Sequence, residues 1–433
     1  SNNIDFQSVK NYLTFQFVPA PNTIYADIKK LSPSNYLVYN LNDKSINIEN
    51  YWQPTFRRNN RINNRDDLSR NLRLQIEKSV DKWSTSDVPI GVSLSGGIDS
   101  SIITALLSKN NSNLATWSLG FEDKNLQNID ERNLASLIAK RYNTNHTEIS
   151  IDSKFVLNDL SDMVYSLDEP YGGGLPSWFV YKEMSKQLKV CLTGTGGDEL
   201  FGNYKKWAPY KNIKIAIRTL LKSIKINGIR NIINNPKGSF YPSYMGEIET
   251  NSILLDYFKN YNSISLIDHK WAKSNTSNVI DGIAYTDFYF QLTDEFLHMT
   301  DRFSMNFSME ARTPFLDHEL IEFVFNINYR DRVNAKNLKK LLIESTSDLL
   351  PHEVINASKK GFVIPHDIWL NNGLKNLAKK YFSKEFLKRQ NIFSDKLIKN
   401  IVDPFYNGNT LLADKVWTVF MFQFWWDIYQ FKG

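Results

Sequence analysis

The 433-residue sequence contains a single cysteine, Cys191, which excludes an internal disulfide framework and any metal site built from several cysteines. A long uninterrupted apolar run is also missing. The aromatic-rich stretch 416–431 is broken by Gln423, Asp427 and Gln430 and is shorter than the ~20 apolar residues of a membrane span, so we expect a buried terminal helix there. Nothing at the N-terminus has the pattern of a signal peptide, which predicts a cytoplasmic protein without a membrane partner.

A strong excess of charge of one sign is absent as well. Basic residues number 52 and acidic residues 46, and a net charge of +6 is modest for this length, so nucleic acid is not expected as a partner. The basic cluster at 205–206 and 211–230 is the only support for RNA binding, and such runs are ordinarily solvated faces. The chain is long enough for two lobes, because single cores stop growing near roughly 250–300 residues.

A glycine pair joins a predicted strand to a predicted helix early in the chain. Residues 88–94 form a short apolar run, residues 98–107 carry apolar side chains at helical spacing, and Ser95, Gly96 and Gly97 make the turn. Without Cβ atoms this turn lets a phosphate approach the backbone amides, and the positive end of the helix dipole favours the anion. The alternative is an ordinary glycine turn of an α/β fold.

The residues after the glycine pair indicate which kind of phosphate site this is. A Walker A loop needs a Lys and a Ser or Thr there, but the chain has Ile98 and Asp99. Because a carboxylate repels a phosphate unless a divalent cation lies between them, Asp99 is predicted to bind Mg²⁺. Ser95 and Ser100 are predicted to donate to phosphate oxygens.

The surrounding pattern alternates strands and helices, which predicts a parallel sheet with its ligands beyond the carboxyl ends of the strands. Leu119 is expected beside adenine, near the end of the second strand. The expected elements are a helix at 66–83, strands at 114–121, 146–151 and 190–193, and a helix at 130–142.

A second glycine-rich motif, Gly194-Thr195-Gly196-Gly197-Asp198-Glu199-Leu200-Phe201-Gly202, follows the predicted strand at 190–193. Its glycines let the backbone approach a ligand, and its acidic pair arrives at the carboxyl end of a strand. Asp198 is therefore predicted to complete the Mg²⁺ site that Asp99 begins.

These motifs carry a resemblance. Residues 95–101 resemble the pyrophosphate-binding loop of the ATP pyrophosphatase (PP-loop) superfamily, whose members cleave ATP between the α- and β-phosphates and transfer AMP. Residues 194–202 resemble the Gly-x-Gly-x-Asp-Glu-x-Phe-Gly segment of class B asparagine synthetases. The likeness covers nearly the whole chain and implies an α/β parallel-sheet PP-loop domain, a helical C-terminal lobe and a small N-terminal β remnant. The implied boundaries are 1–55 for the remnant and 56–433 for the synthetase-like domain, with the PP-loop core at 66–205 and the helical lobe at 206–433.

Three further segments match the family. Asp168-Glu169-Pro170 resembles a substrate-proximal segment, although two carboxylates before a proline are also an ordinary helix end. Glu310-Ala311-Arg312-Thr313-Pro314 resembles a site-shaping signature that we expect at a helix end, with a structural salt bridge as the alternative. Lys359-Lys360-Gly361-Phe362 resembles a loop whose lysine stabilises the acyl-adenylate, and this implies that role for Lys359.

Residues 1–55 alternate apolar and polar positions around turns, which predicts strands at 14–18, 23–25 and 35–39. This segment resembles the end of the glutaminase domain of asparagine synthetases. The sequence as given starts with Ser1-Asn2-Asn3 and has no N-terminal cysteine nucleophile, so we expect ammonia or another amine to come from a glutaminase domain, a partner or elsewhere.

The resemblance implies ATP-dependent, AMP-forming amide synthesis from a small carboxylate and an amine, with aspartate and ammonia as the default substrates. Thr195 stands where many family members have Glu, and a hydroxyl is a poor general base, so ammonia is in doubt. The implied catalytic residues are Lys359, Thr195, Glu310 and Arg312; the ATP and pyrophosphate residues are Ser93, Leu94, Ser95, Gly96, Gly97, Asp99, Ser100, Leu119, Gly194 and Lys359; the substrate residues are Asp168, Glu169, Gly196 and Glu199; and the Mg²⁺ ligands are Asp99 and Asp198.

Three alternatives stay open at this point. The ligase can use another carboxylate or another amine, including an intramolecular amine that closes a ring. The chain can instead be a non-catalytic or RNA-binding relative, although Asp99, Asp198 and Lys359 are intact. An oligomer is compatible with everything in the sequence.

Overall fold

The computed structural model describes residues 3–56, 64–122, 126, 130–202, 213–258, 261–332, 339–357 and 364–431. Its centre is a five-stranded sheet of order β5-β4-β3-β6-β7 in which every neighbouring pair is parallel. The strands are β3 (Ile90–Ser93), β4 (Ala115–Phe121), β5 (Asn145–Ile151), β6 (Val190–Leu192) and β7 (Glu310–Arg312). The predicted α/β parallel-sheet class is confirmed.

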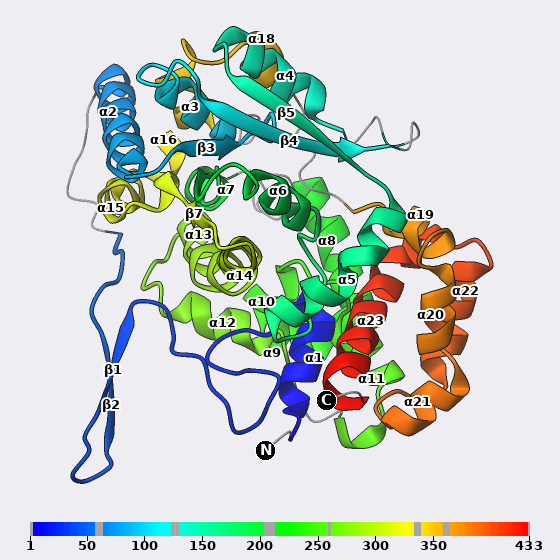
Figure 1. The fold of residues 1–433 in the computed structure, drawn as a ribbon. Coiled ribbons are helices and arrows are strands. Elements are labelled where there is room, and N and C mark those ends of the chain that lie inside the picture. The colour runs from blue at the N-terminus through cyan, green and yellow to red at the C-terminus, as the bar shows by residue number, and fades with distance from the viewer. Residues whose placement is uncertain are drawn as a thin grey trace.

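Helices cover both faces of this sheet, as Figure 1 shows. One face carries α3 (Ile98–Leu107) and α4 (Arg132–Arg141), and the other carries α6 (Pro176–Met184), α7 (Gly197–Phe201) and α14 (His298–Asn306). The chain runs outward from β3 to β4 and β5 and then returns to the opposite side of β3 as β6. The direction of strand order therefore reverses at β3, and open α/β sheets bind ligands beyond the carboxyl ends of the strands at such a point.

The helix predicted at 66–83 is present as α2 (Arg65–Ser84). Asn64 caps its N-terminus by accepting a hydrogen bond from the amide of Asp66, and two acidic residues in the first turn complement the helix dipole. Leu68, Leu72 and Ile76 lie on one face and are buried against the core under α3, because their spacing of four places them in one row.

The rest of the chain is largely helical, so the predicted helical C-terminal region is confirmed. Most of its helices lie below the sheet in Figure 1. Between the sheet strands and through the C-terminal half, the elements are α5 (Ser153–Leu167), α8 (Ile213–Asn227), α9 (Ile229–Asn234), α10 (Pro236–Phe240), α11 (Glu247–Ile253), η3 (Asp256–Phe258), α12 (Ser265–Ala272), α13 (Val279–Asp287), the π-helical η4 (Phe288–Leu297), η5 (Pro314–Leu316), α15 (His318–Asn326), α16 (Tyr329–Arg332), α17 (Lys340–Thr346), α18 (His352–Asn356), α19 (His366–Asn371), α20 (Lys375–Tyr381), α21 (Lys384–Gln390), η6 (Ile398–Val402), α22 (Asp403–Tyr406), η7 (Thr410–Leu412), α23 (Ala413–Trp426) and η8 (Asp427–Phe431).

The N-terminal segment differs in part from the prediction. The expected strand at 14–18 is wrong: helix α1 (Phe6–Phe15) runs through its start, and Asp5 caps that helix. The expected strand at 23–25 is reduced to isolated bridges. The strand at 35–39 is confirmed as β1 (Asn35–Tyr39), which forms an antiparallel hairpin with β2 (Ile46–Asn50). Tertiary packing decides this outcome, because most of the apolar residues of α1 are buried and those of the hairpin remain largely exposed.

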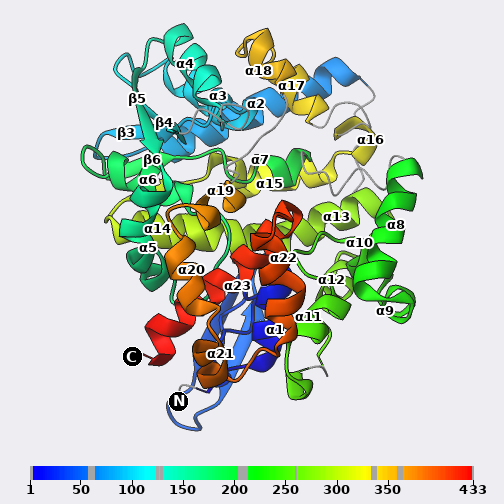
Figure 2. The ribbon, with the colours of Figure 1, turned by 90° about the vertical axis from the view of Figure 1, so that its right-hand side faces the viewer.

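Helix α1 packs beside α23, the buried terminal helix predicted from the sequence, as both views show (Figures 1 and 2). The hydroxyl of Tyr12 donates to the carbonyl of Thr418 at 2.9 Å. Nε2 of Gln16 donates to the side-chain hydroxyl of Thr418 at 2.7 Å. The buried Lys10 forms an ion pair of 2.6 Å with the buried Glu247 of α11. Of the helices among the described residues, none is both long and apolar enough to cross a membrane.

Candidate active site

The predicted phosphate loop lies at the carboxyl end of β3, as expected. Ser95 and Ser100 face each other across it, with 3.1 Å between their hydroxyl oxygens, and Ser100 also donates to the carbonyl of Gly97 at 3.2 Å. Gly96 has φ of +80°, a conformation in which a side chain is strained. Gly97 precedes α3 without a side chain that caps the first turn. The loop therefore presents hydroxyl groups and a helix N-terminus, the groups that hold an anion.

The second glycine-rich loop follows β6 and contacts the first loop directly. A Cβ atom on Gly194 would lie 2.9 Å from both Cβ of Asp99 and the amide nitrogen of Ser100. Only glycine allows this approach, because real Cβ atoms do not come so close to other heavy atoms. Two motifs far apart in the sequence thus form one wall, as their positions at the ends of neighbouring strands predicted.

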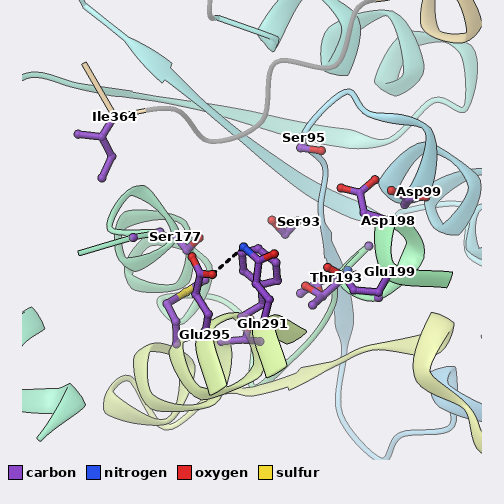
Figure 3. Close-up of a pocket in the computed structure, with 18 of the residues that line it drawn as sticks. Ser93, Ser95, Asp99, Ser177, Thr193, Asp198, Glu199, Gln291, Glu295 and Ile364 are labelled. Atoms are coloured by element: carbon purple, nitrogen blue, oxygen red, sulfur yellow. Dashed lines mark hydrogen bonds between the residues drawn. The ribbon is translucent and has the colours of Figure 1, made fainter. Parts of the chain in front are cut away.

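A cavity of about 480 Å³ opens at this wall. It collects many of the predicted residues: Ser93, Ser95, Asp99, Ser100, Gly194, Thr195, Gly196, Asp198 and Glu199. Figure 3 shows Asp99 and Asp198 on one side of the cavity beside Ser95, and Glu295 with Gln291 on the other side. Ser93 lies between the two groups in this view. The cavity therefore has two ends with different chemistry.

Lys339 is a site residue that the sequence reasoning missed. Its ammonium group lies 2.5 Å from Oδ1 of Asp198 and also contacts the carboxylate of Asp99. Its backbone amide donates to the carbonyl of Phe201 at 3.2 Å, which ties the residue to the second loop. The sequence marks this position only by a pair of lysines before an apolar helix, and nothing there distinguishes the buried Lys339 from its neighbour.

The donor set at this end fits Mg²⁺. Asp99 and Asp198 bring two carboxylates together, and hard carboxylate oxygens are the protein ligands that Mg²⁺ prefers. The structure places the ammonium group of Lys339 between them, so the two carboxylates already share a cation. Among the described residues, no group of three or more His, Cys, Asp or Glu side chains is placed to hold a metal ion.

The other end of the cavity is built from the π-helical segment η4 and the triple-glycine link 172–174. Glu295 is buried, and its Oε2 accepts a hydrogen bond of 2.8 Å from Nε2 of Gln291. A Cβ on Gly173 would lie 2.9 Å from Oε1 of Glu295 and from the hydroxyl of Tyr171. The glycine link 172–174 is packed closely against the cavity. The signal that marks Glu295 is a carboxylate inside an apolar helical run.

His366 and Asp414 complete this end. Nδ1 of His366 lies 2.8 Å from Oδ1 of Asp414, and the imidazole stacks on the ring of Trp417 with a centroid distance of 4.6 Å. Burial lowers the pKa of His366, although the carboxylate of Asp414 acts in the opposite direction. The imidazole is therefore neutral at neutral pH, with Nδ1 donating to Asp414.

Other predicted residues lie elsewhere in the fold. Asp168 and Glu169 are not among the residues that line the cavity. Glu169 forms an ion pair of 2.5 Å with Lys30 and accepts a hydrogen bond from the amide of Ile24, so it fastens the N-terminal segment. Asp168 is largely exposed and lies 3.3 Å from the guanidinium of Arg302. Their role toward a substrate stays a prediction.

Glu310 and Arg312 were expected at a helix end, but the structure places them in the edge strand β7. The preceding helix, α14, already ends at Asn306. The guanidinium of Arg312 lies 2.8 Å from Glu310 and donates to the carbonyls of Trp83 and Thr85 at 3.0 and 2.6 Å. The left-handed conformation of Ser308, with φ of +51°, turns the chain between the helix and the strand. The contacts correspond to the structural alternative, since they join β7 to the end of α2.

The remaining predicted positions support the loops or lie outside the described residues. Leu94 and Leu119 are buried in the sheet, and Gly96 and Gly97 form the turn itself. Lys359 lies outside the described residues, so its role stays a prediction. Cys191 is buried in β6, and burial raises the pKa of its thiol to about 12, which keeps the thiol protonated.

Comparison with known proteins decides the family. The model of the asparagine synthase family matches residues 71–427. The chain belongs to this family. Membership identifies it as an ATP-dependent amide ligase, and the predicted resemblance is confirmed.

Individual relatives match this family member over most of its length. A glutamine-hydrolysing asparagine synthetase of Bacillus subtilis (strain 168) is 28% identical over 450 residues, which are 98% of this chain and 69% of the relative. A putative glutamine-hydrolysing asparagine synthetase of Mycobacterium bovis is 25% identical over 447 residues, 98% of this chain and 68% of the relative. A second Bacillus subtilis asparagine synthetase is 25% identical over 382 residues, 82% of this chain and 57% of the relative.

Proposed function

We propose that the chain joins a carboxylate to an amine by way of an acyl-adenylate, with AMP and pyrophosphate as the other products. Aspartate and ammonia are the default substrates. The observation that carries this proposal is the direct contact of the two glycine-rich loops at Gly194, which brings Asp99, Asp198 and the hydroxyl groups of Ser95 and Ser100 to one wall of a cavity. The helix N-terminus and the hydroxyl groups of such a wall suit phosphate oxygens, and its two carboxylates suit a divalent cation bound to them.

In the first step the substrate carboxylate attacks the α-phosphate and pyrophosphate leaves. Ser95, Ser100 and the N-terminus of α3 hold the departing phosphates, and Lys339 adds positive charge between the two acidic side chains. Mg²⁺, held by Asp99 and Asp198, would neutralise the charge of the pyrophosphate.

In the second step the amine nitrogen attacks the acyl carbon, the bond to AMP breaks, and the nitrogen loses one proton. Fixed positions for both reactants lower the entropic part of this barrier. Lys359 is proposed to stabilise the carbonyl oxygen. The relatives' names describe glutamine hydrolysis, which supports ammonia supply by a glutaminase domain or partner. A cytoplasmic location stays part of the proposal.

A different amine is the second candidate within the same chemistry. Thr195 lines the cavity, and the hydroxyl of Thr193 donates to its hydroxyl at 3.0 Å. A threonine can orient an amine but does not accept its proton efficiently. Thr195 is therefore a weaker base than the Glu that many family members have at this position.

The decisive test is ³¹P NMR of the protein with MgATP and aspartate, with and without ammonium, together with mass spectrometry of the products. AMP, pyrophosphate and asparagine appearing together only with ammonium establish an asparagine synthetase. AMP and pyrophosphate without asparagine leave an adenylating ligase with other substrates. ATP that stays intact with every carboxylate and amine tested contradicts the ligase proposal.

A pair of variants tests the metal assignment in the same assay. Asp99→Ala removes a proposed Mg²⁺ ligand, and we expect loss of ATP cleavage by roughly a hundredfold or more. Asp87→Ala, at an exposed position before the opposite end of β3, is the matched control and should leave the rate unchanged. Full activity in Asp99→Ala would show that the assignment is wrong.

A further inference from the structure

One ring nitrogen of His366 is buried without a hydrogen bond. The other nitrogen, Nδ1, lies 2.8 Å from Oδ1 of Asp414 and donates to it. Nε2 has no hydrogen-bond partner among the residues that the structure describes. Buried polar atoms without a partner are rare in folded proteins because they cost free energy, and a catalytic site is one place where they occur. His366 also lines the reaction cavity, so its unpaired nitrogen belongs to the site.

The neighbours of His366 hold its ring in one orientation. The imidazole stacks on the ring of Trp417, with 4.6 Å between the centroids and 19° between the planes. Trp417 is itself fully buried, and its indole nitrogen donates to the carbonyl of Gly172 at 2.8 Å. The hydrogen bond to Asp414 fixes the rotation of the imidazole within this stack. A proton acceptor that is held in place before the reaction acts more efficiently than a mobile one.

The protonation state of His366 suits a base. Burial lowers the pKa of the imidazole, so at neutral pH the ring is neutral and Nε2 carries a lone pair. The charged groups that act in the opposite direction are Asp414 of α23 and Asp367 of α19 itself. Their negative charge stabilises the imidazolium that forms when Nε2 takes up a proton. Asp414 is an exposed carboxylate, with 65% of its side chain accessible, so this proton has a path to solvent.

Other groups of the cavity are less suited to accept a proton. Thr195 is a weak base. Tyr181 and Tyr244 line the cavity, but burial raises the pKa of both phenols, so they keep their protons at neutral pH. Glu295 is a carboxylate in the same wall, and its Oε2 accepts the hydrogen bond from Gln291. Glu295 is therefore the rival acceptor, and a variant distinguishes it from the imidazole.

We propose that His366 is the general base of amide formation, with Nε2 as the atom that takes the proton lost by the amine nitrogen. The bond from nitrogen to the acyl carbon forms, the bond from that carbon to the AMP oxygen breaks, and the proton moves to Nε2. The imidazolium beside Asp414 then releases a proton to solvent. This inference rests on the ligase function and the default substrates proposed above, and it supplies the base that Thr195 does not.

The two half-reactions separate the base from the rest of the site. Exchange of labelled pyrophosphate into ATP with aspartate measures adenylation, and asparagine production with ammonium measures amide formation. His366→Asn keeps an amide that donates to Asp414 but has no basic nitrogen. We expect exchange within about twofold of the unmodified rate and amide formation slower by roughly a hundredfold, the usual loss of a general base. His352→Asn, at an exposed position, is the matched control and should change neither rate.

Chemical rescue distinguishes lost basicity from lost packing. His366→Ala leaves space beside Trp417 for a small ring. Added imidazole should raise the rate of amide formation in this variant by roughly tenfold, because it returns a basic nitrogen to the site. Pyrazole has the same shape but is a much weaker base, and it should not restore the rate. A purely structural role predicts equal effects of the two rings.

The pH dependence of amide formation provides a second signature. Below the pKa of His366 the rate depends on two deprotonations, one of the amine and one of the imidazole. The slope of log rate against pH should therefore fall from about two in the unmodified chain to about one in His366→Asn. Asp414→Asn removes a charge that raises the pKa of the imidazole, so the bend in the profile should move to lower pH.

The outcomes separate this inference from the ligase proposal. Three results overturn the base and leave the ligase function standing: normal amide formation in His366→Asn, equal losses of exchange and amide formation in that variant, or equal rescue by imidazole and pyrazole. Loss of amide formation in Glu295→Gln together with normal amide formation in His366→Asn assigns the proton to Glu295 instead. Failure of the unmodified chain to exchange pyrophosphate or to form asparagine contradicts the default ligase function, and the inference that rests on it.

Discussion

The ammonium group of Lys339 lies 2.5 Å from Oδ1 of Asp198 and contacts the carboxylate of Asp99, so one cation joins the acidic residues of the two glycine-rich loops. All three side chains are largely buried. Two neighbouring carboxylates that are shielded from water repel each other unless a cation lies between them. Lys339 therefore holds the two loops together.

Replacing Lys339 tests this arrangement. Lys339→Gln removes the charge, and we expect kcat/KM for MgATP to fall by roughly a hundredfold, the usual effect of losing one electrostatic group. Thermal stability without Mg²⁺ should also fall, with part of it restored by added Mg²⁺. The control is Lys340→Gln, whose side chain is 3.6 Å from Glu344 on the helix surface and should change neither quantity. An Lys339→Gln enzyme with normal kinetics would contradict the role.

A substitution in the phosphate loop tests its backbone geometry. Gly96→Ala places a Cβ 2.8 Å from the carbonyl oxygen of Glu131 at φ of +80°, so we expect about 1–3 kcal/mol of lost stability and weaker MgATP binding. Gly408→Ala is the control, because φ is +105° there but no heavy atom lies within 4 Å. Urea unfolding and calorimetry measure both effects. Equal losses in both variants would show that the contact with Glu131 is unimportant.

The buried ion pair between α1 and α11 is expected to fasten the N-terminal segment. Lys10→Met leaves Glu247 charged in the interior, where it also accepts a hydrogen bond from Ser263, so we expect the free energy of unfolding to fall by about 3–5 kcal/mol. The double variant Lys10→Met/Glu247→Leu should lose less than the sum of the single losses. Lys396→Met, at an exposed site, is the control in the same urea titrations; additive losses in the pair would contradict coupling.

His298 provides a pH test. Burial, and then the charges of Lys30 and Arg302, lower the pKa of its imidazole from 6.5 to about 4. Between these values the unfolded chain binds a proton that the folded chain does not, so the free energy of unfolding falls as the pH drops from 6.5 and levels off below about 4.

The measurement compares unfolding curves of His298→Gln and the unmodified chain across this pH range. The variant should show a shallower decline, since only the contribution of His298 is removed and the carboxylates titrate in both proteins. His352→Gln, at an exposed position, should leave the slope unchanged. Identical slopes in all three proteins would mean that His298 titrates alike in the folded and unfolded chains.

Local patterns predicted the sheet and the nucleotide end of the site. The apolar run before the 95–97 turn and the helical spacing after it indicated a strand and a helix, and the same alternation placed 194–199 at a neighbouring strand. Because parallel strands end at one edge of a sheet, these two motifs had to meet, and their contact at Gly194 confirms it. Glycine requirements and strand ends are local properties, so sequence alone reveals them.

Packing between distant segments decided the rest. Residues 6–15 are helical because most of their apolar side chains are buried against α11, η3 and α23, and Lys339 is buried because α17 begins beside the end of α7. Glu295, His366 and Asp414 come from separate helices and carry no common motif, yet they form one acidic end of the cavity. The sequence by itself determined the family, the sheet and the phosphate loop. Only the tertiary structure decided which charges meet at the cavity, because a side chain's neighbours across the core leave no pattern along the chain.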